Sequence, residues 1–475
     1  MKPSPIAREL SRQLGPDAVL WRPEDLMLYE YDGIACLKQP DAVVLPLTTQ
    51  DVVAIVKLAA REKLPIIPRG SGTGLSGGSV VTEGGIVVGF ARMKRILEID
   101  AENLRARVQP GVVNFDVSLA VSDLGLYFAP DPSSQRACTI GGNVAENAGG
   151  PHTLAYGVTT NHVLGLEIVL PDGEVVRTGA SFLDRPGYDL TGFVVGSEGT
   201  LGMVTEATVR LSRKPEAVKT LLAIYDSILD APRTVAAITE RRITPAALEM
   251  MDGFTLRAVE EAFHAGFPMD SAAVLLIEVE GVHEAVEDYA DQLEAICKEN
   301  NAREVRRAKS AEERELLWRG RKNAFGALGR ISPNYYVQDG VIPRTRLPQM
   351  LEFIGQVSEK YRIRAGNIFH AGDGNLHPLL MFDARDKDQV DRVMKTAHEI
   401  MTKCVELGGS LTGEHGIGLE KRDLMPLVFS EDDLDLMKRM KGVFNPEGRF
   451  NPGKVLPTSK MCGELRVQVS AGGEA

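Results

Sequence analysis

Two glycine-rich segments carry the side chains best suited to metal chemistry. The first runs from His370 to His377 through Gly372-Asp373-Gly374, and the second is Gly413-Glu414-His415-Gly416. Divalent metals such as Zn²⁺ prefer imidazole and carboxylate ligands, and a catalytic site keeps one coordination position open. Because the glycine turn cannot continue a helix, His370 and His377 are expected on either side of it, where their rings could converge. Two histidines and a glutamate are therefore a candidate metal site. Turn residues and hydrogen-bonded core histidines are the competing interpretation.

A third histidine and two arginines could act on a substrate. His415 follows Glu414 directly, and histidine is the side chain best matched to proton removal near neutral pH. The alternative is a histidine that only donates hydrogen bonds to its neighbours. Arg319 and Arg321 lie on a predicted helix, and guanidinium groups bind carboxylates bidentately. Two residues apart, they point to different faces of that helix, and solvated surface charge is the alternative role.

A glycine motif at residues 72–77 matches G-x-G-x-x-G directly after a predicted strand. A dinucleotide site of the Rossmann type also requires a helix after the motif, because the pyrophosphate binds at that helix's N-terminus. Here Ser79-Val80-Val81 leads to Gly84-Gly85 and a further strand. The motif therefore does not indicate NAD, although successive backbone N–H groups in a turn can still bind phosphate.

Three more loops of small and hydroxyl-bearing residues follow, at residues 130–134, 140–150 and 196–202. Small residues let a ligand approach the backbone closely. Four such loops in one region suit a large, extended ligand with a pyrophosphate, for which FAD is the natural candidate.

The surrounding pattern predicts the elements that position these residues. A βαβ-like unit is expected over 41–69, followed by short strands at 85–90 and 105–109, a hairpin over 164–176 and a glycine-interrupted strand pair over 194–210. After Lys214-Pro215 the pattern of predicted secondary structure changes. Longer helices are expected at 229–241, 284–299, 311–328 and 389–407, with a strand at 273–280. A final helix begins after Ser430, a favourable N-cap.

Composition excludes several classes. Among 475 residues the net charge is −11, which disfavours a nucleic-acid binder. No apolar run approaches the roughly 18 residues of a membrane span, and the N-terminus does not read as a secretory signal. Five cysteines are scattered without a CxxC pair, which argues against a disulfide framework and against an iron–sulfur cluster. A cytoplasmic enzyme is expected.

The segment Pro68–Gly74, the Gly141-Gly142-Asn143 loop and residues 196–202 resemble the FAD-binding domain of the vanillyl-alcohol oxidase (PCMH-type) superfamily. The resemblance covers roughly residues 20 to 457. It is greatest to the FAD-linked D-2-hydroxy-acid dehydrogenases, including the flavin-bearing catalytic subunits of bacterial glycolate oxidases.

The resemblance implies an α+β fold: a PCMH-type FAD-binding domain of two α+β subdomains, and a C-terminal α+β substrate domain with an antiparallel sheet. The expected divisions are an N-terminal helical segment over 1–40, the FAD-binding domain over 41–215, a substrate- and metal-binding cap domain over 216–443, a segment over 444–457 that returns to the FAD domain, and a disordered tail over 458–475.

The resemblance also implies site roles. His370, His377 and Glu414 would bind a divalent metal, with zinc favoured over manganese or iron; His415 would be the catalytic base, and Arg321 would hold the substrate carboxylate. Some relatives attach FAD through a histidine in the first glycine loop, where this chain has Thr73, so non-covalent FAD is expected. The expected FAD-binding residues are Pro68, Arg69, Gly70, Ser71, Gly72, Thr73, Gly74, Leu75, Pro130, Asp131, Ser133, Gly141, Gly142, Asn143, Gly149, Gly150, Tyr156, Gly157, Glu198, Gly199, Gly202 and Val204.

The implied reaction is oxidation of a small D-2-hydroxy acid, with glycolate favoured, to the 2-oxo acid by hydride transfer to FAD. D-lactate or D-2-hydroxyglutarate are alternative substrates, and a metallohydrolase is an alternative class. Val337 and Phe325 fall near positions that are polar in relatives acting on longer acids, which disfavours a large diacid. Electrons would pass to a partner or quinone rather than NAD. Iron–sulfur and second flavin subunits are the implied partners, with peripheral membrane association only through them.

Overall fold

The computed structural model of the chain describes residues 3–33, 38–180 and 187–458. The chain forms two compact units. Unit 1 comprises Met1–Gly149, Val158–Lys214 and Glu414–Ala475, and unit 2 comprises Gly150–Gly157 and Pro215–Gly413. Unit 2 begins next to the predicted boundary at 215 but ends well before the predicted 443. From residue 459 the predicted tail lies outside the described residues, as do Cys36 and Cys462.

Two differences from the predicted divisions have a structural cause. The segment from Glu414 onward belongs to unit 1 because the backbone oxygen of Ser76 accepts from the N–H groups of Leu419 and Glu420. Conversely, Gly150–Gly157, predicted within the FAD-binding domain, belongs to unit 2. The reason is a side-chain contact: Leu154 packs against the hydrophobic core of unit 2.

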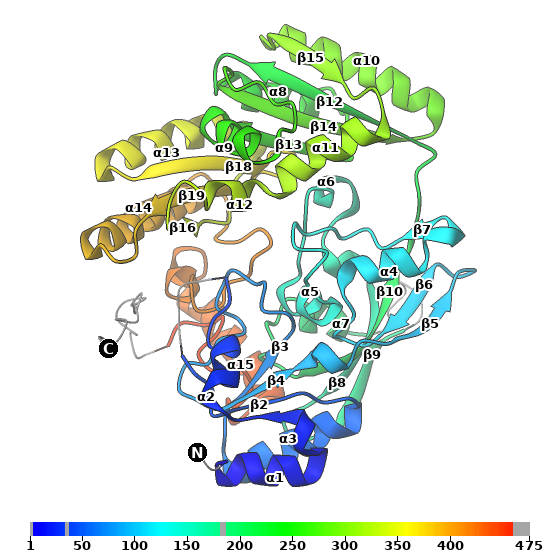
Figure 1. Ribbon diagram of the computed structural model, residues 1–475, viewed down its shortest axis with the longest axis vertical. Coiled ribbons are helices and arrows are strands. Elements are labelled where there is room, and N and C mark those ends of the chain that lie inside the picture. The colour runs from blue at the N-terminus through cyan, green and yellow to red at the C-terminus, as the bar shows by residue number, and fades with distance from the viewer. Residues whose placement is uncertain (1–2, 34–37, 181–186, 459–475) are drawn as a thin grey trace. The chain divides into compact units, whose positions relative to one another are not determined.

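Unit 1 is built on two main sheets (Figure 1). The first has the order β1-β2-β4-β3. The two strands of the predicted βαβ unit, β2 and β3, are not neighbours in this sheet. Both pair in parallel with β4, which lies between them. The strands are β1 (Val19–Leu20), β2 (Ala42–Val44), β3 (Ile66–Arg69) and β4 (Ile86–Gly89), and the helices packed nearby are α1 (Pro5–Leu14), α2 (Pro23–Leu26) and α3 (Thr49–Glu62).

The second sheet of unit 1 is antiparallel, with the order β5-β6-β10-β8-β9. The predicted hairpin over 164–176 is β8 with β9. The predicted strand pair over 194–210 is instead one strand, β10, preceded by the short helix α7 and a glycine loop. The bounds are β5 (Ile96–Asp100), β6 (Arg105–Val108), β8 (Val163–Val169), β9 (Val175–Gly179), β10 (Met203–Arg210), α4 (Asn114–Ala120), α5 (Ile140–Glu146) and α7 (Leu190–Val194), with a small pair of β7 (Leu126–Tyr127) and β11 (Ser212–Arg213).

The returning segment of unit 1 contains the helix α15 (Glu431–Phe444). As predicted, Ser430 caps this helix: its hydroxyl accepts from the N–H of Asp433, whose carboxylate accepts from the N–H of Ser430. This reciprocal pair satisfies donors that a helix start otherwise leaves unpaired.

Unit 2 is an antiparallel sheet with the order β15-β12-β14-β13-β18-β19-β16, and β17 also pairs with β19. The predicted antiparallel sheet of the C-terminal domain is confirmed. The strands are β12 (Ala217–Tyr225), β13 (Ala247–Asp252), β14 (Ala273–Gly281), β15 (Glu304–Arg307), β16 (Asn334–Val337), β17 (Gly340–Val341), β18 (Arg364–His370) and β19 (Asn375–Phe382).

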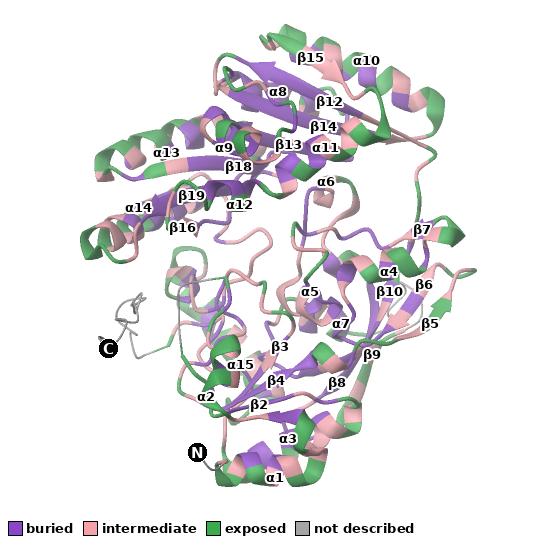
Figure 2. Cartoon of the chain, in the orientation of Figure 1, coloured by how far each residue is buried: buried purple, intermediate pink, exposed green. Residues whose placement is uncertain are grey.

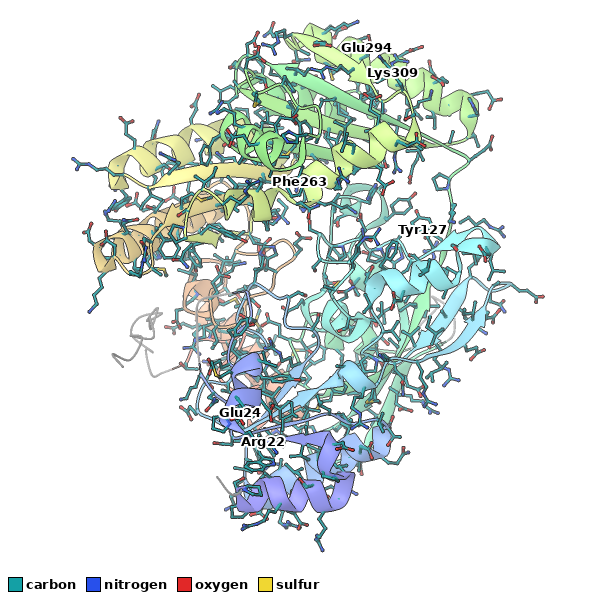
Figure 3. The ribbon with its side chains drawn as sticks, in the orientation of Figure 1. Arg22, Glu24, Tyr127, Phe263, Glu294 and Lys309 are labelled. Atoms are coloured by element: carbon teal, nitrogen blue, oxygen red, sulfur yellow. The ribbon has the colours of Figure 1, made fainter. Side chains whose placement is uncertain are left out.

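Both faces of this sheet are covered, so its central strands β13, β14 and β19 are buried almost throughout, whereas the edge strands β15 and β16 are mostly half-buried (Figure 2). Alternate residues serve the two faces: Leu221 joins the core under α8, α10, α13 and α14, whereas Leu222 joins the core under α9, α11 and α12. Charged side chains cover the outside, where Glu294 of α10 pairs with Lys298 and Arg307 (Figure 3). The helices are α6 (Thr153–Tyr156), α8 (Asp230–Glu240), α9 (Gly253–Phe263), α10 (His283–Glu299), α11 (Ala311–Lys322), α12 (Ala324–Leu328), α13 (Leu347–Tyr361) and α14 (Lys387–Glu406).

Candidate active site

A row of polar side chains interrupts the apolar face of the unit 2 sheet beneath α11. Glu278 of β14, Glu249 of β13, His370 of β18 and His377 of β19 are all buried, with at most 4% of each residue exposed. Their strand neighbours on the same face, such as Leu276 and Ile368, belong to the core under α9, α11 and α12. Buried ionisable groups are costly unless paired, so each member needs a partner.

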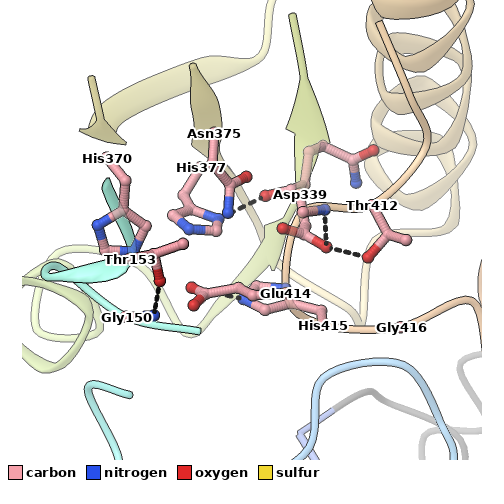
Figure 4. Close-up of polar contacts among 12 residues, drawn as sticks. Gly150, Thr153, Asp339, His370, Asn375, His377, Thr412, Glu414, His415 and Gly416 are labelled. Carbon is pink, nitrogen blue, oxygen red and sulfur yellow. Dashed lines mark hydrogen bonds and ion pairs between the residues drawn. The ribbon is translucent and has the colours of Figure 1, made fainter. Parts of the chain in front are cut away.

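His370 and His377 lie on either side of the predicted tight turn, at the ends of β18 and β19 (Figure 4). Their ring centroids are 5.1 Å apart at nearly a right angle, and each offers a ligand atom within 4.8 Å of the other's. The Nδ1 of His370 lies 2.8 Å from Glu249 Oε1, and the Nδ1 of His377 lies 3.2 Å from the carbonyl oxygen of Gln338. With Nδ1 the donor in both rings, Nε2 keeps the lone pair that a metal requires.

Glu249 connects His370 to Arg321. The two strands pair so that Glu249 stands directly opposite His370, and the Nη2 of Arg321 lies 2.5 Å from Glu249 Oε2. Burial raises the pKa of the Glu249 carboxyl, but Arg321 and His370 outweigh it and hold the pKa below its usual value. The carboxylate is therefore ionised, which gives a buried cation and a buried anion that neutralise each other.

Arg321 lies on the inner face of α11 and is 3% exposed, whereas Arg319 is exposed. The predicted division between the faces of the helix is thus confirmed. The Nε of Arg321 is buried without a hydrogen-bond partner in the part of the chain that the structure describes. An orphaned guanidinium donor is costly to bury, and it provides a place for an anionic ligand.

The last residues of unit 2 are held close to His377. The carboxylate of Asp339, which is fully buried, accepts from the Thr412 hydroxyl at 2.5 Å and from the Gly413 N–H at 3.1 Å (Figure 4). Asp339 also offers an oxygen within 4.8 Å of the ligand atom of His377.

Glu414 and His415 follow these residues in the chain and are grouped with unit 1. The hydrogen bond to Asp339 fixes the position of Gly413. Because consecutive Cα atoms are about 3.8 Å apart, the segment that carries Glu414 and His415 must begin next to it. The Nε2 of His415 lies 3.8 Å from Glu414 Oε1.

The first glycine loop of unit 1 follows β3 and is not followed by a helix, as predicted. Gly72 has φ +74°, and a Cβ there would lie 2.2 Å from the guanidinium of Arg69. Arg69 is itself buried against the ring of Tyr29 and donates to Ser79. The hydroxyl of Ser76 is buried and has no hydrogen-bond partner among the described residues. The loop therefore leaves a polar atom that a bound ligand could satisfy.

Gly141, Gly142 and Asn143, expected in a loop, lie within helix α5, because the hydroxyl of Thr139 accepts from the N–H of Gly142 and caps the helix. Glycine at 141 allows close packing, since a Cβ there would lie 2.6 Å from Pro110. The side-chain nitrogen of Asn143 is buried without a partner in the described ranges.

Glu198, expected to bind FAD, directs its carboxylate at another part of unit 1. It accepts hydrogen bonds from the N–H groups of Ile417 at 2.7 Å and Gly418 at 2.8 Å. Its carbonyl oxygen accepts from Asn451, which also donates to the carbonyl of Gly78. The side chain of Glu198 thus holds the segment that follows His415.

Glu146 is a residue that sequence reasoning missed. A Cβ on Gly78 would lie 2.6 Å from one of its carboxyl oxygens, and a Cβ on Gly416 would lie 2.3 Å from the other. Burial and the nearby carboxylates of Glu198 and Asp32 raise the pKa of the Glu146 carboxyl well above the usual value, and this carboxyl lies between two glycine-rich segments. No motif signals it, because its environment comes from distant parts of the chain.

The remaining predicted FAD residues fall into two groups. In unit 1, Gly199 packs on Pro68, Gly202 packs on Ile168, and Val204 is in β10. Unit 1 also contains the predicted residues of the earlier loops: Gly70, Ser71, Thr73, Gly74, Leu75, Pro130, Asp131, Ser133 and Gly149. Gly150, Tyr156 and Gly157 belong to unit 2. There the Tyr156 hydroxyl donates to Glu280.

Glu249 and Glu278 were also absent from the predicted site. Both stand among apolar residues inside buried strands, Ala247–Asp252 and Ala273–Gly281, and a glutamate with apolar neighbours on both sides in such a strand is a signal available from sequence. Glu278 accepts from both Arg314 and Trp318, at 2.6 and 2.7 Å.

Comparison with known proteins assigns the family. Residues 40–179 match an FAD binding domain, and residues 214–455 match the C-terminal domain of FAD linked oxidases. The chain is 46% identical over 448 residues to glycolate oxidase subunit GlcD of Escherichia coli K12, covering 94% of this chain and 90% of the relative. It is 31% identical to a D-lactate dehydrogenase of Anaerostipes hadrus, covering 96% and 98%.

The fold agrees with a solved structure of p-cresol methylhydroxylase, with a TM-score of 0.81 at 18% identity, covering 94% of this chain and 96% of that one. The chain belongs to the FAD-linked oxidases and is an FAD-linked oxidoreductase of the PCMH-type fold.

Proposed function

We propose that this protein oxidises a small D-2-hydroxy acid, with glycolate favoured, to the corresponding 2-oxo acid. The observation that carries the proposal is the buried row of Arg321, Glu249, His370 and His377 in a chain of the FAD-linked oxidases. The similarity to a glycolate oxidase subunit over nearly the whole chain supports glycolate. The similarity to a D-lactate dehydrogenase keeps D-lactate as the alternative substrate.

The residues of unit 1 fit non-covalent FAD. The buried Ser76 hydroxyl and the buried side-chain nitrogen of Asn143 have no hydrogen-bond partner among the described residues, and they lie on the first glycine loop and on α5, two segments of the predicted cofactor site. When bound, FAD supplies the hydride acceptor. Thr73 stands where some relatives carry a histidine that attaches FAD covalently, so the cofactor of this chain would be released by denaturation.

The residues of unit 2 fit a divalent metal. His370 and His377 present Nε2 as the lone-pair atom, and Glu414 would complete the set. A bound metal would lower the pKa of the substrate hydroxyl. His415 would take the hydroxyl proton, while the buried N–H of Arg321 would donate a hydrogen bond to one carboxylate oxygen of the substrate. Imidazole ligands favour zinc but also suit iron, and a carboxylate suits manganese.

Aromatic side chains support a small substrate. The ring of Phe325 lies edge-on to His377, with centroids 6.2 Å apart, and next to the ring of Tyr335. The ring of Phe325 beside the two histidines carries no hydrogen-bond donor for a second carboxylate, which supports glycolate and D-lactate over D-2-hydroxyglutarate.

The electrons of reduced flavin would pass to a partner or a quinone rather than to NAD. The relative's name as a glycolate oxidase subunit supports a multi-subunit complex. Iron–sulfur and second flavin subunits as the partners rest on the family resemblance alone. No helix in the described ranges is both long and apolar enough to cross a bilayer. Separately, the proposed partner subunits would be the route by which the chain associates peripherally with the inner membrane.

The first experiment is anaerobic mixing of the yellow protein with glycolate, D-lactate or D-2-hydroxyglutarate while the visible flavin band is recorded. We expect glycolate to bleach it fastest. Faster bleaching by a longer acid would reassign the substrate and keep the mechanism. No bleaching by any of the three would refute hydroxy-acid oxidation, and a colourless protein that hydrolyses esters would favour a metallohydrolase.

A further inference from the structure

The carboxylate of Glu249 is shared by two groups with different tasks in the proposed reaction. It lies 2.8 and 2.9 Å from the Nδ1 of His370 through its two oxygens, and 2.5 Å from the Nη2 of Arg321. All three side chains are buried, so water does not compete for these contacts. One carboxylate therefore determines the ring orientation of His370 and the position of the Arg321 guanidinium.

We propose that Glu249 is a positioning residue that fixes the spacing between the metal-binding face of His370 and the carboxylate-binding donors of Arg321. This inference rests on the proposed function. Glycolate carries its hydroxyl and its carboxylate on adjacent carbons, so the groups that bind them must be held at a fixed separation. A shared anion between them is a direct way to hold it.

The fold makes Glu249 suited to this task. Its strand pairs with β18 so that Glu249 and His370 are cross-strand neighbours on one face, and such neighbours have Cβ atoms about 5 Å apart. Arg321 reaches the same carboxylate from α11, which packs on that face. The negative charge on Glu249 also strengthens the basicity of the opposite ring nitrogen of His370, the one offered to a metal.

Asp252 provides a matched control on the same strand. Its carboxylate is also buried and also accepts hydrogen bonds, from the N–H groups of Thr255 and Asn367 and from the Asn367 side chain. In the part of the chain that the structure describes, these hydrogen bonds involve neither His370 nor Arg321. The variants Glu249→Gln and Asp252→Asn therefore each replace a buried carboxyl group of the same strand with an amide, and only the first affects the two proposed site residues.

The experiment compares wild type, Glu249→Gln and Asp252→Asn as full-length flavoproteins. Three quantities are measured: metal content with the rate of metal loss to EDTA, KM and kcat for glycolate, and the melting temperature. We expect Glu249→Gln to lose metal about ten- to a hundredfold faster and to show a raised KM as well as a lowered kcat. We expect Asp252→Asn to lower the melting temperature while metal loss and KM stay as in wild type.

Glu249→Asp keeps the charge that neutralises Arg321 and serves if the glutamine variant does not fold. Because the shorter side chain withdraws the carboxylate by one methylene, the same two readouts should change in the same direction. Wild-type metal retention and KM in either folded Glu249 variant would overturn the inference. A wild-type protein that binds no metal and is not reduced by any hydroxy acid would instead refute the proposed function itself.

Discussion

The carboxylate of Glu198 accepts a hydrogen bond from the backbone N–H of Gly418 at 2.8 Å. A residue of the glycine motif at 196–202 therefore anchors the loop of a second glycine-rich motif, 220 positions later in the chain. A second N–H, from Ile417, donates to its other oxygen at 2.7 Å. His415 lies just before these two residues. The proposed base is thus on a loop whose conformation is set by a buried side chain of the predicted FAD-binding region.

Replacing Glu198 with alanine should weaken this loop. Two N–H groups, one buried and one partly buried, would lose their acceptor, at a cost of about 2 kcal/mol in the free energy of unfolding. A displaced His415 would lower turnover by up to about a hundredfold. Urea unfolding and flavin-reduction rates would measure the two effects. Glu206→Ala, which removes a partly exposed partner of Arg107, is the control and should leave both nearly unchanged. A fully active Glu198→Ala would show that the loop needs no such anchor.

Removal of His377 should release the metal before it affects the flavin. Its ring contributes one of the two imidazoles of the proposed site, whereas the FAD loops belong to unit 1. His377→Ala is therefore expected to retain visible flavin absorbance and to lack metal on elemental analysis. His398→Ala, at an exposed histidine of α14, should retain both. Full metal content in His377→Ala would exclude it as a ligand.

His415→Ala should separate binding from chemistry. The variant keeps the carboxylate and both imidazoles of the proposed metal set, so FAD and metal are expected to stay bound. Flavin reduction by glycolate should slow by about a hundredfold or more, the usual contribution of a general base. Stopped-flow reduction measures this directly, and a near-normal rate would rule out His415 as the base.

Glu278 should govern the acid stability of unit 2. Although burial raises its pKa, hydrogen bonds from His152 and Arg314 and the Arg314 charge hold that pKa far below the usual value of 4.5. A depressed carboxyl pKa stabilises the fold above the unfolded-state value, and the contribution is lost as pH falls below about 4.5. We expect Glu278→Gln to cost about 3 kcal/mol at pH 7 and to flatten the acid side of the stability curve. Trp318, which donates to Glu278, is the fluorescent reporter, and an unchanged acid slope would contradict this account.

His162 should produce a second pH effect, in unit 1. Burial and, to a lesser degree, Arg210 lower its pKa from 6.5 to about 4. The folded state thus holds the ring neutral, and stability present above pH 6.5 is lost as pH falls toward 4, by about 3 kcal/mol in all. In His162→Gln the decrease in melting temperature between pH 7 and pH 5 should be smaller than in wild type. An equal decrease in both proteins would assign the effect to other groups.

Local sequence determined many of the individual turns, strands and helix faces of this protein. The Gly372–Gly374 turn placed His370 and His377 on paired strands, because a turn of that composition ends one strand and begins the next. The missing helix after Gly77 followed from the strand-forming residues behind it. The two faces of α11, one with buried Arg321 and one with exposed Arg319, followed from helical periodicity.

Only the tertiary structure decided which residues share an environment. Glu249 meets His370 and Arg321 across 121 and 72 positions of sequence, and Glu198 meets Gly418 across 220. The placement of Gly150–Gly157 in unit 2 and of the segment from Glu414 in unit 1 also depends on such distant contacts. The composition and periodicity of a segment indicate which local conformation it favours and which of its residues are buried. Strand order and side-chain pairing depend instead on which distant segments pack together. A motif can therefore name a reactive side chain, and the fold selects the partners that set its charge and orientation.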